Sequence, residues 1–167
     1  NDSAFPPVVF VHGALVDSRL WDAVAARLVE QGFRCLQPNL PLGAHTIPVN
    51  DRGALTPPGV AGIVHDFLVA LDLDDVTLVG NDTGGAMCQV LCARKPARVA
   101  RLVLTNCDAF EVFPPKEFAY LKTLYKIPGA AWLAAKLMHG SARMRHMPSA
   151  FGALAARPLD DAMLRSW

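Results

Sequence analysis

One stretch near the middle of the chain decides its fold: Val76-Thr77-Leu78-Val79-Gly80-Asn81-Asp82-Thr83-Gly84-Gly85-Ala86. It begins as a short apolar run, which is typical of a buried strand, and it continues into a segment with the spacing of a helix. Between the two, Asp82 has one glycine two positions before it and another two positions after it. Glycines at those places let the backbone turn tightly without Cβ clashes. The stretch therefore predicts a sharp strand-to-helix turn with Asp82 at its tip.

The residue at the tip of this turn indicates the reaction class. Turns of this layout commonly present a serine nucleophile, whereas this chain has Asp82 at the serine position. A carboxylate attacks carbon through oxygen and forms an alkyl-enzyme ester, which suits substrates with a leaving group on sp³ carbon. The start of a helix also favours a charged carboxylate. We therefore predict that Asp82 is a catalytic nucleophile; the alternative is that it caps the following helix.

Composition restricts the class of protein. The chain has 167 residues, 52% of them hydrophobic, which is enough for one sizeable core. A net charge of +1 with mixed signs argues against a nucleic-acid partner, and no apolar run reaches the ~18 residues of a membrane span. The cysteines lack the spacing of a metal or redox motif and predict a cytoplasmic protein with reduced thiols and no metal or cofactor. They are Cys35, Cys88, Cys92 and Cys107.

Strands alternate with helices over the first two thirds of the chain, which predicts an α/β fold with a mostly parallel sheet covered by helices on both faces. Asp17 or Ser18 is expected to cap the first helix, a long loop is expected to reach Pro58, and Lys95-Pro96 is expected to end the helix after Asp82. The predicted strands are Val8 to Val11, Phe33 to Leu36, Val76 to Val79 and Val99 to Leu104; the first two predicted helices carry apolar stripes from Leu20 to Val29 and from Val60 to Leu71.

The pattern changes near Phe113, after which helical stretches follow without a further strand. We therefore predict an α/β core over residues 1–112 and a helical lid over residues 113–167. Helices are expected over residues 118–124, 130–138 and 150–156. Within the lid, an apolar stripe is expected to pack on the core and a small basic cluster to be solvated. The stripe is Trp132, Leu133, Leu137 and Met138, and the cluster is Arg143, Arg145 and His146.

The order of these elements, with His12-Gly13 after the first strand, resembles the α/β-hydrolase fold family. The aspartate in the turn, Gly80-Asn81-Asp82-Thr83-Gly84-Gly85, resembles the epoxide hydrolase and haloalkane dehalogenase branch. The resemblance covers the chain from Val8 into the lid. It implies further strands before the first one, and two more strands after the lid that carry the catalytic histidine. We therefore expect a fragment, or a second chain that completes the fold.

The resemblance also implies an oxyanion hole, a pair of backbone N–H groups that stabilise a developing negative charge. Its donors would be the N–H of Ala14 and the N–H of Thr83. Gly13 would let the loop approach closely, and His12 and Gly13 are expected to line the substrate site; the alternative is an ordinary turn at the end of a strand. Asp108, with Asn106 as a polar neighbour, is a candidate for the acid that orients the histidine, or else caps a turn.

Two features of the resemblance bear on the substrate. Tyr120 and Tyr125 are the only tyrosines, and both fall in the lid, where epoxide hydrolases use tyrosines to donate a hydrogen bond to the epoxide oxygen; alternatively, they line an apolar pocket. Their spacing places them about 140° apart on a helix, so at most one would face the site. Thr83 stands where haloalkane dehalogenases commonly carry tryptophan, and fluoroacetate dehalogenases arginine.

Together these observations predict a hydrolase of small, apolar, electrophilic substrates that acts through an ester at Asp82. Epoxides are the first expectation and haloalkanes the second. A non-catalytic ligand-binding protein of the same fold is the alternative from another class. His45, His65, His139 and His146 fall on elements unsuited to the catalytic base. The 167 residues alone are therefore expected to be inactive.

Overall fold

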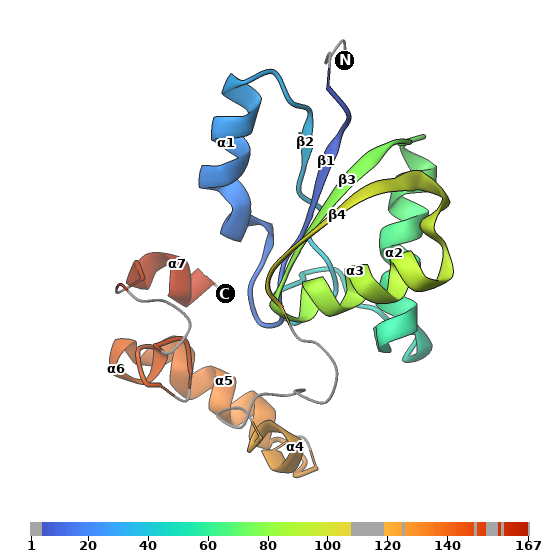
Figure 1. Cartoon of the computed structure of the whole chain (residues 1–167). Coiled ribbons are helices and arrows are strands. Elements are labelled where there is room, and N and C mark those ends of the chain that lie inside the picture. The colour runs from blue at the N-terminus through green and yellow to red at the C-terminus, as the bar shows by residue number, and fades with distance from the viewer. Residues whose placement is uncertain are drawn as a thin grey trace. The chain divides into compact units, whose positions relative to one another are not determined.

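The computed structural model describes residues 5–107, 119–124, 126–148, 150–152, 157 and 159–166. The chain divides into two compact units, Asn1–Ala109 and Phe110–Trp167. Figure 1 shows the strands in the first unit and helices α4 to α7 in the second. Each unit is described separately below.

A parallel sheet of four strands in the order β2-β1-β3-β4 forms the centre of the first unit. The predicted α/β fold with a parallel sheet is confirmed. The first strand agrees with its prediction residue for residue, whereas the second is shorter and the last two continue further. The strands are β1 (Val8–Val11), β2 (Cys35–Leu36), β3 (Val76–Asn81) and β4 (Val99–Cys107).

The helices of this unit lie on both faces of the sheet (Figure 1). Asp17 caps a short 3-10 helix. The α-helix that follows it in the chain begins at Asp22, whereas the sequence predicted a helix start at Asp17 or Ser18. Thr56 caps the next helix, which begins at Pro57, inside the segment that was predicted to be a loop. Proline fits there because the first helical N–H has no intrahelical partner. The elements are η1 (Ser18–Trp21), α1 (Asp22–Glu30), η2 (Gly53–Leu55), α2 (Pro57–Ala70), α3 (Asp82–Arg94) and η3 (Pro96–Arg98).

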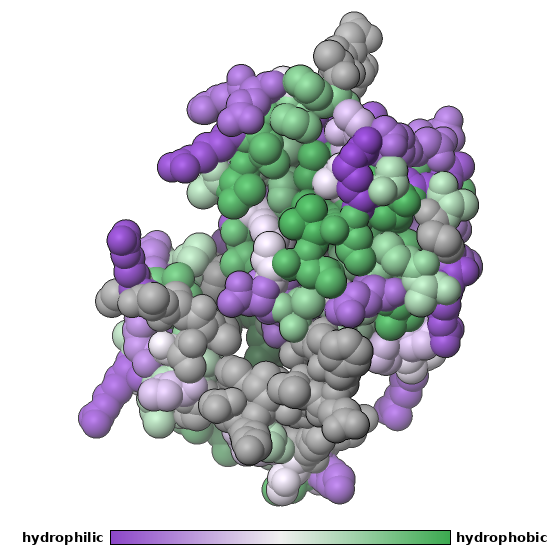
Figure 2. Space-filling view, viewed as in Figure 1, coloured by the Kyte–Doolittle hydropathy of each residue, from purple (hydrophilic) through white to green (hydrophobic). Residues whose placement is uncertain are grey.

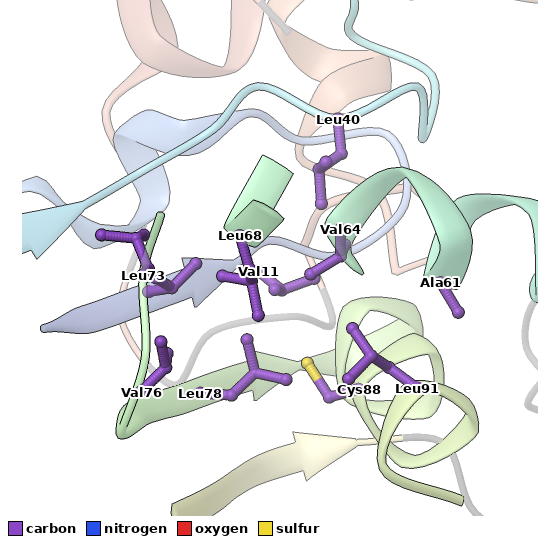
Figure 3. Close-up of a cluster of buried hydrophobic side chains, with 11 residues drawn as sticks. Val11, Leu40, Ala61, Val64, Leu68, Leu73, Val76, Leu78, Cys88 and Leu91 are labelled. Carbon is purple, nitrogen blue, oxygen red and sulfur yellow. The ribbon is translucent and has the colours of Figure 1, made fainter. Parts of the chain in front are cut away.

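The core has two halves, one on each face of the sheet, because successive side chains of a strand point to opposite faces. On one face, Val9 and Val11 pack with side chains of α2, α3 and β3, as Figure 3 shows for Val11, Val64, Leu68 and Leu78. On the other face, Val8 and Phe10 pack against Trp21 and Ala25 of the first helical segment. Continuous apolar strands are the sequence signature of a sheet covered in this way.

The apolar stripe predicted for the first helix is only partly buried. Trp21 and Ala25 are buried, whereas Val24 and Val29 are 46% and 56% exposed. Buried positions on a helix recur three or four residues apart. The two valines lie next to such positions, at the side of the stripe that faces the sheet.

Within the part of the chain that the structure describes, β4 is an edge of the sheet, since β3 is the strand that pairs with it. Its residues Leu102, Val103 and Leu104 are 38%, 44% and 41% exposed. Their register partners in β3 are Leu78, Val79 and Gly80, so Leu102 and Val103 lie on opposite faces. Figure 2 shows apolar surface over this region of the first unit. The outer strand is therefore apolar on both sides.

The second unit contains α4 (Leu121–Leu124), α5 (Ala130–Gly140), α6 (Ala142–Arg145) and α7 (Asp161–Ser166). The helix predicted over 150–156 is wrong where it can be compared, because residues 150–152 form a turn; residues 153–156 lie outside the described part. The predicted packing of the α5 stripe on the core stays a prediction. Trp132, Leu133 and Leu137 are 66%, 51% and 49% exposed.

Arg145 corrects the prediction that the basic cluster is solvated. Its side chain is only 4% exposed. It donates to both carboxylate oxygens of Asp161, and to the carbonyl oxygens of Met138 and His139 at the end of α5. Arginine has the fork of donors that such a site needs. Arg145, which belongs to α6, therefore joins that helix to α5 and to α7.

All four cysteines are free, and burial raises the pKa of the Cys88 thiol. Within the described ranges, no group of three or more histidine, cysteine, aspartate or glutamate side chains could hold a metal ion. Nor does this part of the chain contain a helix of the length and apolar character that a membrane crossing requires.

Candidate active site

The predicted strand-to-helix turn is present, and Asp82 is at its tip. Asn81 ends β3 and caps α3 with an extended backbone, whereas Asp82 has a positive φ of 51°. A side chain on an L-residue makes this conformation unfavourable. Close packing around the neighbouring glycines holds the turn in place.

Three glycines let the backbone pass at distances that a side chain would forbid. A Cβ on Gly80 would lie 2.7 Å from the Cα of Gly85, and a Cβ on Gly84 would lie 2.2 Å from the carbonyl oxygen of His12. On Gly85 it would lie 2.2 Å from the Cβ of Cys107. The turn therefore packs directly against the ends of β1, β3 and β4, which explains why glycine occupies these positions.

The carboxylate of Asp82 is held by the loop that follows β1. Oδ2 accepts a hydrogen bond from the backbone N–H of Ala14 at 3.0 Å. A Cβ on Gly13 would lie 2.5 Å from the same oxygen, so only glycine allows the loop this approach. The side chain reaches across to β1 rather than capping α3, whose cap residue is Asn81. This geometry disagrees with the alternative that Asp82 is a capping residue.

The two carboxylate oxygens differ in their surroundings. Among the described residues, Ala14 is the hydrogen-bond partner recorded for the carboxylate, and it bonds to Oδ2; none is recorded for Oδ1. Thr83 is half-buried in the first turn of α3, where backbone N–H groups point toward the helix N-terminus and favour negative charge. Ala14 and Thr83 thus flank the region in which the carboxylate lies.

His12, which the sequence predicts to line the substrate site, lies in the interior of the first unit, and its contact with substrate stays a prediction. Its side chain is fully buried. Nε2 accepts a hydrogen bond from the N–H of Leu40 at 2.9 Å, and Nδ1 lies 2.9 Å from the carbonyl oxygen of Gly13. Burial lowers the pKa of the imidazole, although the Gly13 carbonyl and Asp17 act in the opposite direction. With both ring nitrogens engaged, His12 supports the loop from inside.

The remaining predicted site residues are only partly described. Asn106 is exposed near the end of β4 and has a φ of 40°. Tyr120 belongs to the second unit and is 43% exposed. Asp108 and Tyr125 lie outside the described residues. The structure therefore brings together Asp82, Thr83, Gly13 and Ala14, and the roles predicted for the tyrosines and Asp108 stay predictions.

Sequence reasoning missed two supports of this site. Leu40, whose N–H binds His12, and Cys107, which packs on Gly85, have no signal in the sequence. Leu15 has a φ of 62° and donates its N–H to the carbonyl of Leu42 at 2.9 Å, so the loop after β2 also holds the loop after β1. Only the folded chain shows that these two loops meet.

The comparison with known proteins assigns the family. The sequence model described as the alpha/beta hydrolase fold matches residues 6–147. The chain belongs to the α/β-hydrolase fold family. The parallel sheet with helices on both faces agrees with the fold that the sequence resemblance implied.

Relatives within the α/β-hydrolase family include dehalogenases and epoxide hydrolases. A haloalkane dehalogenase of Mesorhizobium japonicum is 35% identical over 98 residues, which are 58% of this chain and 30% of that protein. The haloalkane dehalogenase DatA from Agrobacterium tumefaciens C58 is 25% identical with a TM-score of 0.69, over 97% of this chain and 54% of that one. One of the novel epoxide hydrolases from metagenomes of hot environments has a TM-score of 0.70 at 22% identity, over 100% of this chain and 59% of that one. That last likeness shows the fold alone.

The matches cover only part of the relatives. The chain spans between 28% and 36% of the length of the curated relatives it matches. Within the described ranges, no histidine forms a hydrogen bond with Asp82. The activity of the whole protein is therefore a matter for proposal.

Proposed function

We propose that this α/β-hydrolase uses Asp82 as a nucleophile and forms a covalent alkyl-enzyme ester, with epoxides as its substrates. One observation carries the proposal: a carboxylate, and no hydroxyl or thiol, is at the tip of the nucleophile turn and accepts a hydrogen bond from Ala14 at 3.0 Å. An attacking carboxylate suits a leaving group on sp³ carbon. No metal or cofactor takes part.

The hydrogen bond to Ala14 assigns different tasks to the two carboxylate oxygens. Oδ1 attacks a ring carbon, the carbon–oxygen bond of the epoxide breaks, and the oxygen that leaves takes a proton. Oδ2 becomes the carbonyl oxygen of the ester and already accepts from Ala14. When water attacks the carbonyl carbon, Oδ2 takes the negative charge, and the N–H groups of Ala14 and Thr83 stabilise it. The diol then leaves with Oδ1, and the water oxygen stays on Asp82.

Two further groups complete the reaction in this proposal. A tyrosine of the lid, Tyr120 or Tyr125, donates the proton to the epoxide oxygen. A histidine base, oriented by an acid for which Asp108 is the candidate, activates the water. Asn106 is a polar neighbour at the end of β4.

Haloalkanes are the second candidate substrate class. The supporting observation is the 35% identity to a haloalkane dehalogenase over 98 residues. The ester route is the same, but the leaving halide needs no proton. Thr83, which follows the nucleophile, has no indole N–H to hold halide, and epoxides therefore come first. The third candidate, a ligand-binding protein without catalysis, would keep Asp82 only as a support for the loop.

The outer edge of β4 supports a proposal about partners. Leu102, Val103 and Leu104 are exposed on a strand whose outer edge has no partner strand among the described residues, and such an edge pairs readily with another strand. Further polypeptide, from the same protein or from a second chain, therefore covers it in the active enzyme. The free cysteines support a reducing compartment, the cytoplasm.

Isotope labelling tests the ester route. The active enzyme, in excess over a small aryl epoxide, is allowed one turnover in H₂¹⁸O. The diol should contain no heavy oxygen, and the peptide that carries Asp82 should gain it. A matched run with a 1-haloalkane separates the two substrate classes. Asp82→Asn, under conditions that prevent deamidation, is the control and should form no adduct.

Each result has a clear meaning. Heavy oxygen in the first diol would contradict the covalent ester, because it would show direct attack by water. Turnover of the haloalkane alone would replace the epoxide proposal by the second candidate. Binding of both compounds without turnover would favour the non-catalytic protein.

A further inference from the structure

The peptide group between Gly13 and Ala14 is held at both of its polar ends. Its N–H donates to Oδ2 of Asp82 at 3.0 Å. Its carbonyl oxygen, which belongs to Gly13, lies 2.9 Å from Nδ1 of His12. Because a trans peptide is planar, its N–H and its C=O point in opposite directions. Any group that fixes the carbonyl therefore fixes the direction of the N–H as well.

Leu40 and Gly13, two of the neighbours of His12, decide where its proton lies, since the Asn39 side chain that also bonds to the ring can either donate or accept. The N–H of Leu40 can only donate, so Nε2 must accept and carries no proton. The carbonyl of Gly13 can only accept, so Nδ1 must carry the proton and donate it. The imidazole is thus neutral, and it can orient the Gly13 carbonyl only in this tautomer.

Without such support, the loop would be free to turn this peptide. Gly13 has no side chain to restrict its backbone, and glycine adopts many backbone conformations. Leu15, two positions later, already has an unfavourable φ of 62°. Full burial of His12 keeps water from competing for the carbonyl.

We propose that His12, as the Nδ1–H tautomer, is a positioning residue that fixes the rotation of the Gly13–Ala14 peptide and aims the N–H of Ala14 at the Asp82 carboxylate. Its catalytic part rests on the proposed ester route, since that N–H stabilises the charge on Oδ2 during ester hydrolysis. A merely structural role would be to fill space and satisfy Leu40. The two roles predict different results for two isosteric replacements.

Asparagine and glutamine each reproduce one nitrogen of the ring. In His12→Asn, the amide N–H occupies the Nδ1 place and keeps the bond to Gly13, but the acceptor for Leu40 is lost. In His12→Gln, the amide oxygen reaches the Nε2 place and accepts from Leu40, but the donor to Gly13 is lost. The pair therefore separates support of Ala14 from support of Leu40.

Amide NMR spectra of the ¹⁵N-labelled chain give a readout that needs no activity. Asp82→Asn identifies the Ala14 resonance that depends on the carboxylate. We expect this resonance to stay near its wild-type position in His12→Asn and to move upfield in His12→Gln, whereas the Leu40 resonance behaves in the opposite way. An unchanged Ala14 resonance in His12→Gln would overturn the proposal.

Kinetics of the active enzyme provide the second readout. His12→Gln should lower kcat by roughly 10²-fold, as the loss of one oxyanion donor does, leave KM little changed and accumulate the ester at Asp82. His12→Asn should retain most of the turnover. Equal turnover in both variants, with the ester still formed, would refute the role of His12. No ester in any protein, wild type included, would refute the role of Asp82 alone.

The tautomer itself is testable without any variant. A long-range ¹H–¹⁵N spectrum of wild-type protein at neutral pH should show the His12 proton on Nδ1. A proton on Nε2, or on both nitrogens, would overturn the proposal even if the variants do not fold.

Discussion

Gly85 of α3 lies against Cys107, the last residue of β4, so closely that a Cβ on Gly85 would be 2.2 Å from the Cβ of Cys107. The backbone of Cys107 also bridges to that of Asp82. The tip of the turn at Asp82 is therefore attached to the end of the neighbouring strand, and its position depends on that strand.

Replacing this glycine should damage the turn. We expect Gly85→Ala to lower the free energy of unfolding by about 1–3 kcal/mol, because the added methyl group forces the strand and helix apart. Gly62→Ala in α2 is the matched control, since nothing lies within 4 Å of its Cβ, and it should be neutral or stabilising by up to ~1 kcal/mol. Urea denaturation measures both. Equal stability of the two variants would contradict the contact with Cys107.

The stability of the chain should fall as the pH drops below about 6.5. Burial lowers the pKa of His12 from its ordinary value of 6.5. Between that lowered pKa and 6.5, the unfolded chain binds a proton that the folded chain does not, so unfolding is favoured by up to ~1.4 kcal/mol per pH unit. Above 6.5 both states are neutral at this residue, and its contribution becomes constant.

Denaturation curves between pH 5 and pH 7 measure this slope. His12→Asn should flatten it, whereas His139→Asn, which removes an exposed histidine, should leave it as in the wild type. A slope that survives in His12→Asn would show that other groups cause it.

A charged residue introduced into β4 should destabilise the chain much less than one introduced at the paired position of β3. Val103 is 44% exposed, whereas its register partner Val79 is 8% exposed. We expect Val103→Lys to change the stability of the 167-residue chain by less than ~0.5 kcal/mol and to reduce its self-association, and Val79→Lys to destabilise it severely. Analytical ultracentrifugation and urea denaturation test this pair. Strong destabilisation by Val103→Lys would mean that the strand is covered within this chain.

Arg145 should control the order of the second unit. Arg145→Met keeps the bulk of the side chain but removes its bonds to Asp161 and to the two carbonyls at the end of α5. We expect amide exchange in α5 and α7 to accelerate at least about 10-fold, since a lost buried donor leaves these acceptors unpaired. Arg143→Met, at an exposed position, is the control and should change little. Identical exchange in the two variants would contradict the role of Arg145.

Local patterns in the sequence were sufficient for much of the fold. The apolar run at Val8–Val11 predicted β1 residue for residue, and the glycines around Asp82 predicted the turn. The resemblance implied that the N–H of Ala14 is an oxyanion donor beside Asp82; the structure shows this N–H bonded to the carboxylate at 3.0 Å, and the oxyanion role stays a prediction. Each of these features depends on short-range geometry that a motif carries with it.

Features that depend on distant partners could not be predicted. The donor to His12 is Leu40, 28 positions later and in a loop without a motif. The burial of Arg145 depends on Asp161 in a helix that the sequence did not predict. A charged residue without a known partner is predicted to be solvent-exposed, because unpaired charges are rarely buried.

The three glycine contacts of the turn have a consequence for how such an enzyme changes its reaction. Gly80, Gly84 and Gly85 meet backbone atoms of their neighbours and the side chains of Cys88 and Cys107, and none of these contacts involves the Asp82 carboxylate. The backbone shape of the turn therefore does not depend on which side chain position 82 carries at its tip. A residue exchange at the tip can change the attacking atom while the scaffold persists, as between the serine that such turns commonly present and the aspartate of this chain.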